Sequence, residues 1–242
     1  MTGRDPMPLI LHIETATNVC SVALAGDGQL LSLRESTIRN SHAAVITRLI
    51  DEVMQSSNRE LNALDAIAVS KGPGSYTGLR IGVATAKGLC YALDKPLIAI
   101  PTLQAMAFGI QKSKVKNQKS KFEVLFCPMI DARRMEVYYA LYDINGKEMR
   151  DTRAEIIHED SFSDLLADHT ILFGGDGSRK CREVLKSKEN AVFIDDFEAS
   201  AQFMISLAKE KFERQEFEDL AYFEPFYLKD FIAAKARVKG LL

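Results

Sequence analysis

Two acidic residues stand at equivalent points of two similar stretches of the sequence. Glu14 ends the apolar run PLILHIE, and Asp131 follows the apolar run VLFCPMI. A short polar turn and a second apolar run come after each acid. In a duplicated fold, two such carboxylates face each other across a cleft and could hold Mg²⁺ on a nucleotide. The alternative interpretation is a pair of exposed turn acids.

A glycine-rich turn, GGDGS, could add backbone N–H groups to the same nucleotide site. It contains Gly174, Gly175 and Asp176 and lies between an apolar run and a predicted helix. A plain strand-to-helix turn is the alternative. No lysine lies in this turn, or in the turns after the two acids, to bind a phosphate. Together with the two acids, these residues form a candidate for a degenerate nucleotide-binding cleft.

One predicted helix carries a single histidine, His42, and a metal site on that helix would need a second ligand. His42 opens a predicted amphipathic helix over residues 42–56, and Ile46 stands one turn later. One histidine does not make a metal site. The sequence contains no HExxH, HxxxH or CxxC pair. We therefore expect no metal centre, and we expect His42 to be a packed or interface residue.

The segment GPGSYTGLRIG follows an apolar run and opens a second helix, predicted over residues 75–93. Phosphate-binding loops occupy this kind of position. The segment is not a Walker loop, because no Gly-Lys-Ser/Thr follows. It is not a dinucleotide fingerprint, because Thr77 stands where the third glycine belongs.

This second helix is apolar on almost every side. Its only charges are Arg80 and Lys87, and Gly78, Gly82 and Ala86 form a stripe of small residues. Small residues at this spacing let another helix approach closely. The stripe either packs within the chain or forms a helix–helix interface with another subunit.

The elements that carry these residues occur twice in similar order. Three strands, a helix, a strand and a helix are predicted up to residue 93, and the same βββαβα order restarts at residue 124. Between the two units lies a run with five lysines and no acid. We predict an α/β fold with lobe I at 8–110, a basic linker at 111–121, lobe II at 122–216, and a tail at 217–242 that packs on lobe I.

Composition excludes several classes of protein. The 242 residues are 47% apolar and 26% charged, which is typical of a folded globular chain. A net charge of −2 argues against a protein that coats nucleic acid or an anionic membrane. No apolar run reaches the ~20 residues of a membrane helix, and four scattered cysteines are typical of a reduced cytosolic protein. We expect a soluble, cytoplasmic protein.

Several segments, in chain order, resemble the bacterial TsaB (YeaZ) family. They are ILHIETATNVCSVAL, SKGPGSYTGLRIGVATAKGLCYALDKPLIAIPTLQAMA, PMIDARRMEVYYALYD, GGDG and PFYLKDF. The GPGSYTGLRIG block is highly specific, and the others are weaker alone. The family belongs to the machinery for tRNA threonylcarbamoyladenosine (t6A) biosynthesis. The resemblance implies the two-lobed actin/Hsp70-like (ASKHA) fold, in agreement with the doubled βββαβα pattern.

The resemblance also implies a non-catalytic scaffold or activator. Family members are paralogues of the catalytic subunit TsaD, with which they dimerise, and they pair with themselves when alone. A TsaE-like ATPase supports turnover, and a TsaB-type subunit contacts tRNA only as part of the complex. TsaD carries an HxxxH metal motif, whereas Ile46 stands here at the second histidine position. No cofactor is expected beyond weak or vestigial ATP and Mg²⁺. The alternative is a small-molecule kinase or ATPase of the same fold.

The family dimers resemble a helical bundle made from the first two helices of each lobe I. Those helices correspond here to residues 42–56 and 75–93. The partner-interface residues expected from this correspondence are His42, Ile46, Leu49, Gly78, Arg80, Gly82, Val83 and Ala86.

Overall fold

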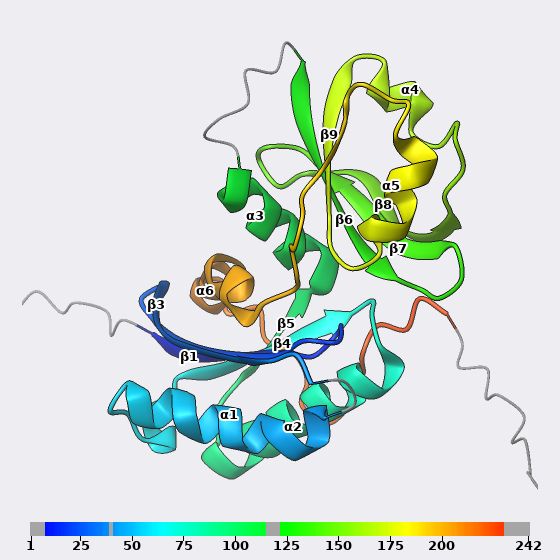
Figure 1. The fold of residues 1–242 in the computed structure, drawn as a ribbon. Coiled ribbons are helices and arrows are strands. Elements are labelled where there is room, and N and C mark those ends of the chain that lie inside the picture. Colours follow the sequence, from blue (N-terminus) through cyan, green and yellow to red (C-terminus); the bar gives the residue numbers. More distant parts are fainter. Residues whose placement is uncertain (1–7, 39–40, 115–121, 230–242) are drawn as a thin grey trace, which may run out of the picture.

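The computed structural model describes residues 8–38, 41–114 and 122–229, which form two lobes around one five-stranded sheet each (Figure 1). The first sheet has the order β3-β2-β1-β4-β5. Strand β1 pairs antiparallel with β2 and parallel with β4. The strands are β1 (Leu9–Glu14), β2 (Cys20–Gly26), β3 (Gln29–Ser36), β4 (Ala66–Gly72) and β5 (Leu97–Pro101).

The second sheet repeats this topology. Its order is β10-β9-β6-β7-β8, so the first strand of the lobe again lies centrally, antiparallel to the second and parallel to the fourth. The strands are β6 (Glu123–Asp131), β7 (Glu136–Tyr142), β8 (Glu148–Ile156), β9 (His169–Gly174) and β10 (Ala191–Phe193). The predicted duplicated α/β fold is confirmed, although the short strand β10 was not predicted.

Two helices cover one face of the first sheet, α1 (His42–Ser56) and α2 (Tyr76–Leu93). Strand β1 is buried on both faces, and its alternate residues Leu9, Leu11 and Ile13 pack with α1 and α2. Both helices match their predicted ranges closely. The Ser75 hydroxyl caps α2 by accepting a hydrogen bond from the Gly78 N–H at 3.2 Å. A short 3₁₀ turn, η1 (Leu61–Ala63), precedes β4.

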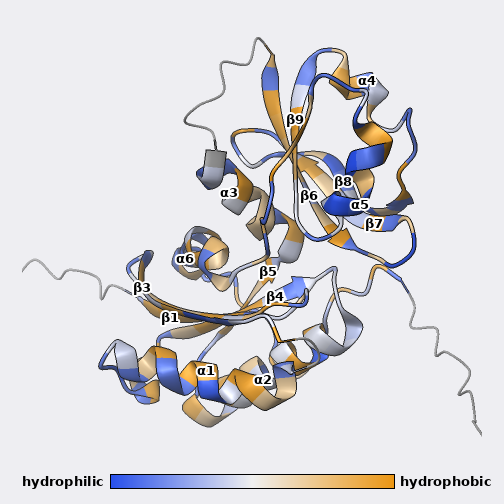
Figure 2. Ribbon diagram, viewed as in Figure 1, coloured by the Kyte–Doolittle hydropathy of each residue, from blue (hydrophilic) through white to orange (hydrophobic). Residues whose placement is uncertain are grey.

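Helix α3 (Thr102–Lys114) lies between the lobes. Its residues Leu103, Met106 and Ile110 pack with Phe126 and Leu172 of the second sheet, while Ala105 packs on the first. The far face of the second sheet carries α4 (Ser163–Leu166) and α5 (Ser178–Leu185). In Figure 2 the central strands are mostly hydrophobic, whereas α5 is strongly hydrophilic.

The last helical segment among the described residues packs on the first sheet. It consists of a 3₁₀ turn, η3 (Ala201–Met204), and α6 (Ile205–Glu213). Met204 and Ala208 are buried against Ile10 and Ile98, and the Lys209 ammonium lies 2.9 Å from Asp27. The sequence grouped this segment with lobe II, within 122–216. The structure instead buries it against the first sheet, which belongs to lobe I.

Within the described residues, no helix is long and apolar enough to cross a membrane. Most of the basic run, residues 115–121, and the end of the tail, residues 230–242, lie outside the described residues.

The small-residue stripe of α2 faces the chain's own turn between β1 and β2. A Cβ atom added at Gly78 would lie 2.1 Å from the Thr15 carbonyl oxygen, and one at Gly82 would lie 2.2 Å from Thr15 Oγ1. Ala86 is fully buried in the core of lobe I. The stripe therefore serves packing within the chain, and the alternative of an intersubunit contact through these three residues is wrong.

A matched pair of glycine substitutions on α2 tests this packing. Gly82→Ala should destabilise the fold by about 1–3 kcal/mol, because Thr15 and the helix must move apart. Gly88→Ala should stabilise it by about 0.5–1 kcal/mol, because a Cβ there meets nothing within 4 Å and alanine is the better helix former. Urea unfolding measures both. Equal effects of the two substitutions would contradict the close approach at Gly82.

Candidate functional site

A cleft of about 780 Å³ opens between the two lobes. Lobe I lines it with the turn at residues 16–18 and the start of α2 at residues 74–77. Lobe II lines it with the hairpin turn at 130–134, with parts of β7 and β8, and with Asp176. The tail contributes residues 226–229.

Asp131 lines this cleft, but its carboxylate is already bound. The Lys180 ammonium donates to Asp131 Oδ1 at 2.6 Å, and also to the carbonyl oxygens of Arg134 and Glu136. The same Oδ1 accepts a hydrogen bond from the Arg133 N–H at 2.7 Å. Asp131 and Lys180 together hold the β6–β7 turn. No signal within the turns themselves points to Lys180, because this residue lies on α5.

Glu14 does not line the cleft. Its side chain lies on the inner face of the first sheet and is 1% exposed. Glu14 Oε1 accepts a hydrogen bond from the Ala16 N–H at 2.6 Å. Burial raises the pKa of Glu14 to about 7, against the hydrogen bonds that favour its charged form. The two acids therefore do not face each other as free carboxylates.

The glycines of GGDGS serve packing. Gly175 has a φ of +108°, and a Cβ there would lie 2.2 Å from the Met129 carbonyl oxygen. A Cβ at Gly174 would lie 3.0 Å from the Ile110 side chain. Asp176 does line the cleft, where its Oδ1 accepts from the Asp131 N–H at 3.0 Å and burial raises its pKa.

The five predicted nucleotide-cleft residues therefore do not form one site. Only Asp131 and Asp176 line the cleft, and Lys180 neutralises the first of them. Across the described ranges, no group of three or more His, Cys, Asp or Glu side chains is placed to hold a metal ion. The residues present do not fit the predicted Mg²⁺–nucleotide arrangement built on Glu14 and Asp131.

The predicted partner-interface residues lie mostly on the inner sides of α1 and α2. Ile46, Leu49 and Val83 belong to the buried core of lobe I. His42 is 7% exposed, and its Nε2 lies 3.0 Å from the Thr17 carbonyl oxygen, to which it donates. Of the predicted set, only Arg80 is exposed. The chain's own sheet covers the apolar faces that the sequence had assigned to a partner.

The outer sides of the same helices carry several small residues, and on α1 these stand beside the exposed charged residues Arg48 and Asp51. Exposed positions include Ala43, Ala44 and Thr47 on α1, and Ala84, Gly88 and Tyr91 on α2. Tyr91 is 84% exposed. A large aromatic side chain beside open backbone is a common feature of protein-binding surfaces. The sequence signal for this face was the lack of charge around α2.

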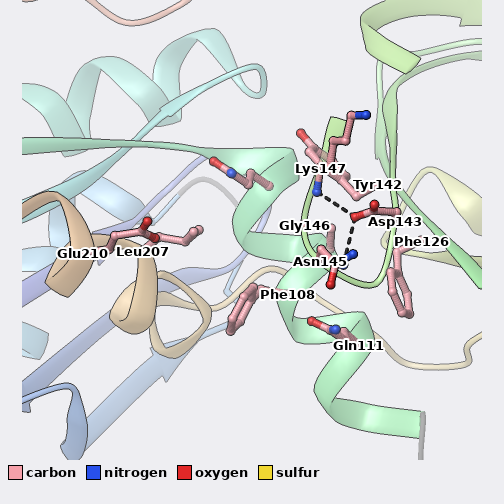
Figure 3. A pocket seen from close by; sticks show the side chains of 12 residues that line it. Phe108, Gln111, Phe126, Tyr142, Asp143, Asn145, Gly146, Lys147, Leu207 and Glu210 are labelled. Atoms are coloured by element: carbon pink, nitrogen blue, oxygen red, sulfur yellow. Dashed lines mark hydrogen bonds between the residues drawn. The ribbon is translucent and has the colours of Figure 1, made fainter. Parts of the chain in front are cut away.

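A second, smaller hollow lies elsewhere at the junction of the lobes, with a volume of about 300 Å³ (Figure 3). Phe108 of α3 and Leu207 of α6 lie on one part of its wall, and the turn between β7 and β8 lies on another. The Asp143 carboxylate holds that turn by accepting from the N–H groups of Asn145 and Lys147, at 2.8 Å each. None of the predicted site residues lies here.

A family model described as TsaD, tRNA N6-adenosine threonylcarbamoyltransferase, matches residues 35–236. The tRNA threonylcarbamoyladenosine biosynthesis protein TsaB of Escherichia coli K12 is 33% identical over 236 residues, which cover 93% of this chain and 96% of that protein. The chain belongs to the TsaB family.

Two further comparisons relate the chain to an enzyme over part of its length and to a solved structure over most of it. A tRNA N6-adenosine threonylcarbamoyltransferase of Staphylococcus saprophyticus is 37% identical over 108 residues, which are 38% of this chain and 32% of that enzyme. The crystal structure of an uncharacterized protein from Pseudomonas aeruginosa with similarity to the peptidase YeaZ shares the fold. Its TM-score is 0.79 at 24% identity, covering 92% of this chain and all of that one.

Two buried titratable groups of β1 oppose each other in their effect on stability. Burial lowers the pKa of His12 to about 4, and it raises that of Glu14 from 4.5 to about 7. His12 binds a proton more readily in the unfolded chain than in the folded one. Its neutral folded form therefore contributes to the free energy of unfolding near neutral pH, and this contribution is lost as the pH falls from about 6.5 to 4. Glu14 keeps its proton to a higher pH in the folded chain than in the unfolded one. Its contribution to the free energy of unfolding is therefore fully present below about pH 4.5 and is lost as the pH rises to 7.

Glu14→Gln should separate these two effects. The amide oxygen can still accept from the Ala16 N–H, while the buried charge is gone. At pH 8 the variant should be more stable than wild type by at most about 3 kcal/mol. Its stability should rise from pH 4 to 6.5, as the His12 slope is no longer opposed. Urea unfolding across pH 4–8 measures this, with the exposed Glu60→Gln as control. Parallel curves for Glu14→Gln and wild type would contradict the buried, raised-pKa carboxyl.

Proposed function

We propose that this chain is a cytoplasmic subunit of the t6A pathway and that it acts by binding a TsaD-like catalytic subunit. The observation that carries this proposal is 33% identity over 93% of the chain to a protein named for tRNA threonylcarbamoyladenosine biosynthesis. The likeness to a threonylcarbamoyltransferase over 108 residues supports descent from the same ancestor as the catalytic subunit.

Several features support a role without chemistry of its own. His42 is bound to a backbone carbonyl, and Ile46 fills the core where a second histidine would stand. All four cysteines are buried, and burial raises their pKa values, so none is an activated thiolate. Asp131 is committed to Lys180. The alternative of a small-molecule kinase or ATPase loses the acid pair on which it was based.

The docking surface that we propose is the outer face of α1 and α2. Both helices lie within residues 35–236, which match the TsaD family model, so a TsaD-like partner would present equivalent helices. Ala43 and Ala44 on α1, with Ala84 and Gly88 on α2, are exposed and small enough for helices to approach closely. Tyr91 would supply an aromatic anchor. Pairing with a second copy, and contact with a TsaE-like ATPase, are further parts of this proposal.

Gly88→Leu should separate docking from folding. The new side chain enters open space in the isolated chain, so the monomer should fold at least as stably as wild type. Against a close-packed partner helix it should weaken binding about tenfold to a hundredfold. Co-purification with the TsaD-type protein of the same cell, followed by titration, measures this. Glu183→Leu, on the exposed side of α5, is the control.

A tRNA modification assay completes this test. Wild type should raise the rate of t6A formation by the TsaD-type protein, and Gly88→Leu should lose that stimulation in proportion to its lost binding. Full binding and full stimulation by Gly88→Leu would place the docking surface elsewhere. No stimulation by wild type would refute the proposed function itself.

The isolated chain should bind tRNA weakly. Its net charge is −2, and its densest basic run, residues 112–121, has only five lysines. Non-specific affinity comes mainly from phosphate neutralisation, so we expect a Kd in the micromolar range or weaker at physiological salt. The complex with the TsaD-type subunit should bind more tightly. Filter retention at two salt concentrations checks this, and tight, salt-resistant binding by the chain alone would contradict it.

A further inference from the structure

After α6, residues 217–229 form an extended segment that we call the strap. It first adds to the edge of the first sheet, where the Glu218 N–H donates to the Leu97 carbonyl oxygen at 2.9 Å. Its residues Leu220 and Phe223 then pack on the core of lobe I. The Lys87 ammonium of α2 donates to the carbonyl oxygens of Ala221 and Phe223, at 3.3 and 3.1 Å. This first part of the strap is anchored to lobe I.

The strap next passes over the loop that begins α2. The Phe226 N–H donates to the Lys71 carbonyl oxygen at 2.7 Å. A Cβ added at Gly72, whose φ is +111°, would lie 2.5 Å from the Phe226 carbonyl oxygen, so the two backbones touch. Arg80 Nε donates to the Tyr227 hydroxyl at 3.3 Å, and its guanidinium lies 4.3 Å from the centre of the Tyr76 ring. The rings of Tyr76 and Tyr227 are 4.8 Å apart.

The described strap ends on the other lobe. Lys229 forms an ion pair with Glu136 of β7, and residues 226–229 line the cleft between the lobes. The chain passes from lobe I to lobe II through α3 and returns after β10. Figure 1 shows the end of the strap on the side of the molecule away from α6. The strap thus links the two lobes by noncovalent contacts, at a place away from α3 and the segment after β10, where the backbone passes between the lobes.

We propose that the strap is a latch: Tyr227 and Lys229 tie the start of α2 to lobe II and hold the cleft at its present opening. The tie is weak by construction, because Lys229 is 44% exposed and Glu136 is 22% exposed. Partly exposed ion pairs contribute little, so the latch can open without unfolding either lobe. When it opens, lobe II is free to move about the connections at α3 and after β10. This inference does not depend on the proposed t6A function.

The latch is tested by measuring the separation of the lobes. Spin labels are attached through Gln55→Cys on α1 and Glu159→Cys on lobe II, both exposed positions, while the four native cysteines are buried. Pulsed electron–electron double resonance gives the distribution of distances between the two spin labels. Lys229→Glu should broaden it and raise the open population by on the order of fivefold. Glu136→Lys should do the same, and the double reversal should restore the wild-type distribution.

A control variant keeps this test specific. Lys186→Glu reverses one charge of an exposed ion pair, with Glu183, that lies within lobe II, and it should leave the distribution unchanged. Tyr227→Ala removes the lobe I side of the latch and should act like Lys229→Glu. The proposal is overturned by a wild-type distribution in Lys229→Glu, by failure of the double reversal to restore it, or by equal broadening in the control. Thermal unfolding of each variant confirms that the lobes remain folded.

Discussion

The arrangement of lobe I depends on the close approach of two backbones, at the turn after β1 and at the start of α2. The Ser75 N–H donates to the Ala16 carbonyl oxygen at 2.6 Å. A Cβ at Gly74 would lie 2.4 Å from that same oxygen, and those at Gly78 and Gly82 would collide with Thr15. At all three positions, which are four residues apart, only glycine permits so close a contact. It fixes α2 against the first sheet and brings residues 16–18 and 74–77 together as one wall of the cleft.

Duplication has given equivalent positions of the two lobes different physical roles. Glu14 and Asp131 both end the first strand of a lobe, yet Glu14 is buried with a raised pKa, whereas Asp131 is half exposed and bound to Lys180. Lobe II also has a hairpin turn at residues 132–135 that carries two arginines into the cleft lining. A cleft that binds a nucleotide through paired acids needs both carboxylates at its surface. In this chain burial removes Glu14 from the cleft surface, and Lys180 neutralises Asp131.

The sequence predicted most of the fold because each pattern had one local solution. The amphipathic pattern of residues 42–56 and the apolar run of residues 75–93 predicted α1 and α2 almost to the residue. The site was harder, because burial is a property of the assembled chain. A helix that is apolar all round does not reveal which side its own sheet covers, so the pattern of α2 could not show that Val83 is buried within the chain. The family correspondence assigned Val83, together with Ile46 of α1, to a partner. Contacts between distant segments, such as Lys180 with Asp131 and Arg80 with Tyr227, leave no periodic signal.

The two surfaces of α2 connect the proposed docking face with the cleft. Its inner side is locked to the turn after β1, so the helix moves only with the first sheet. Its outer side presents Gly88 and Tyr91 to a partner. Its N-terminal part carries Tyr76 and Arg80, which hold Tyr227 of the strap. A partner bound on α1 and α2 would therefore act on a rigid lobe I, and the strap is the element through which lobe II would respond. Because Lys229 and Glu136 form only a partly exposed ion pair, that response needs little free energy.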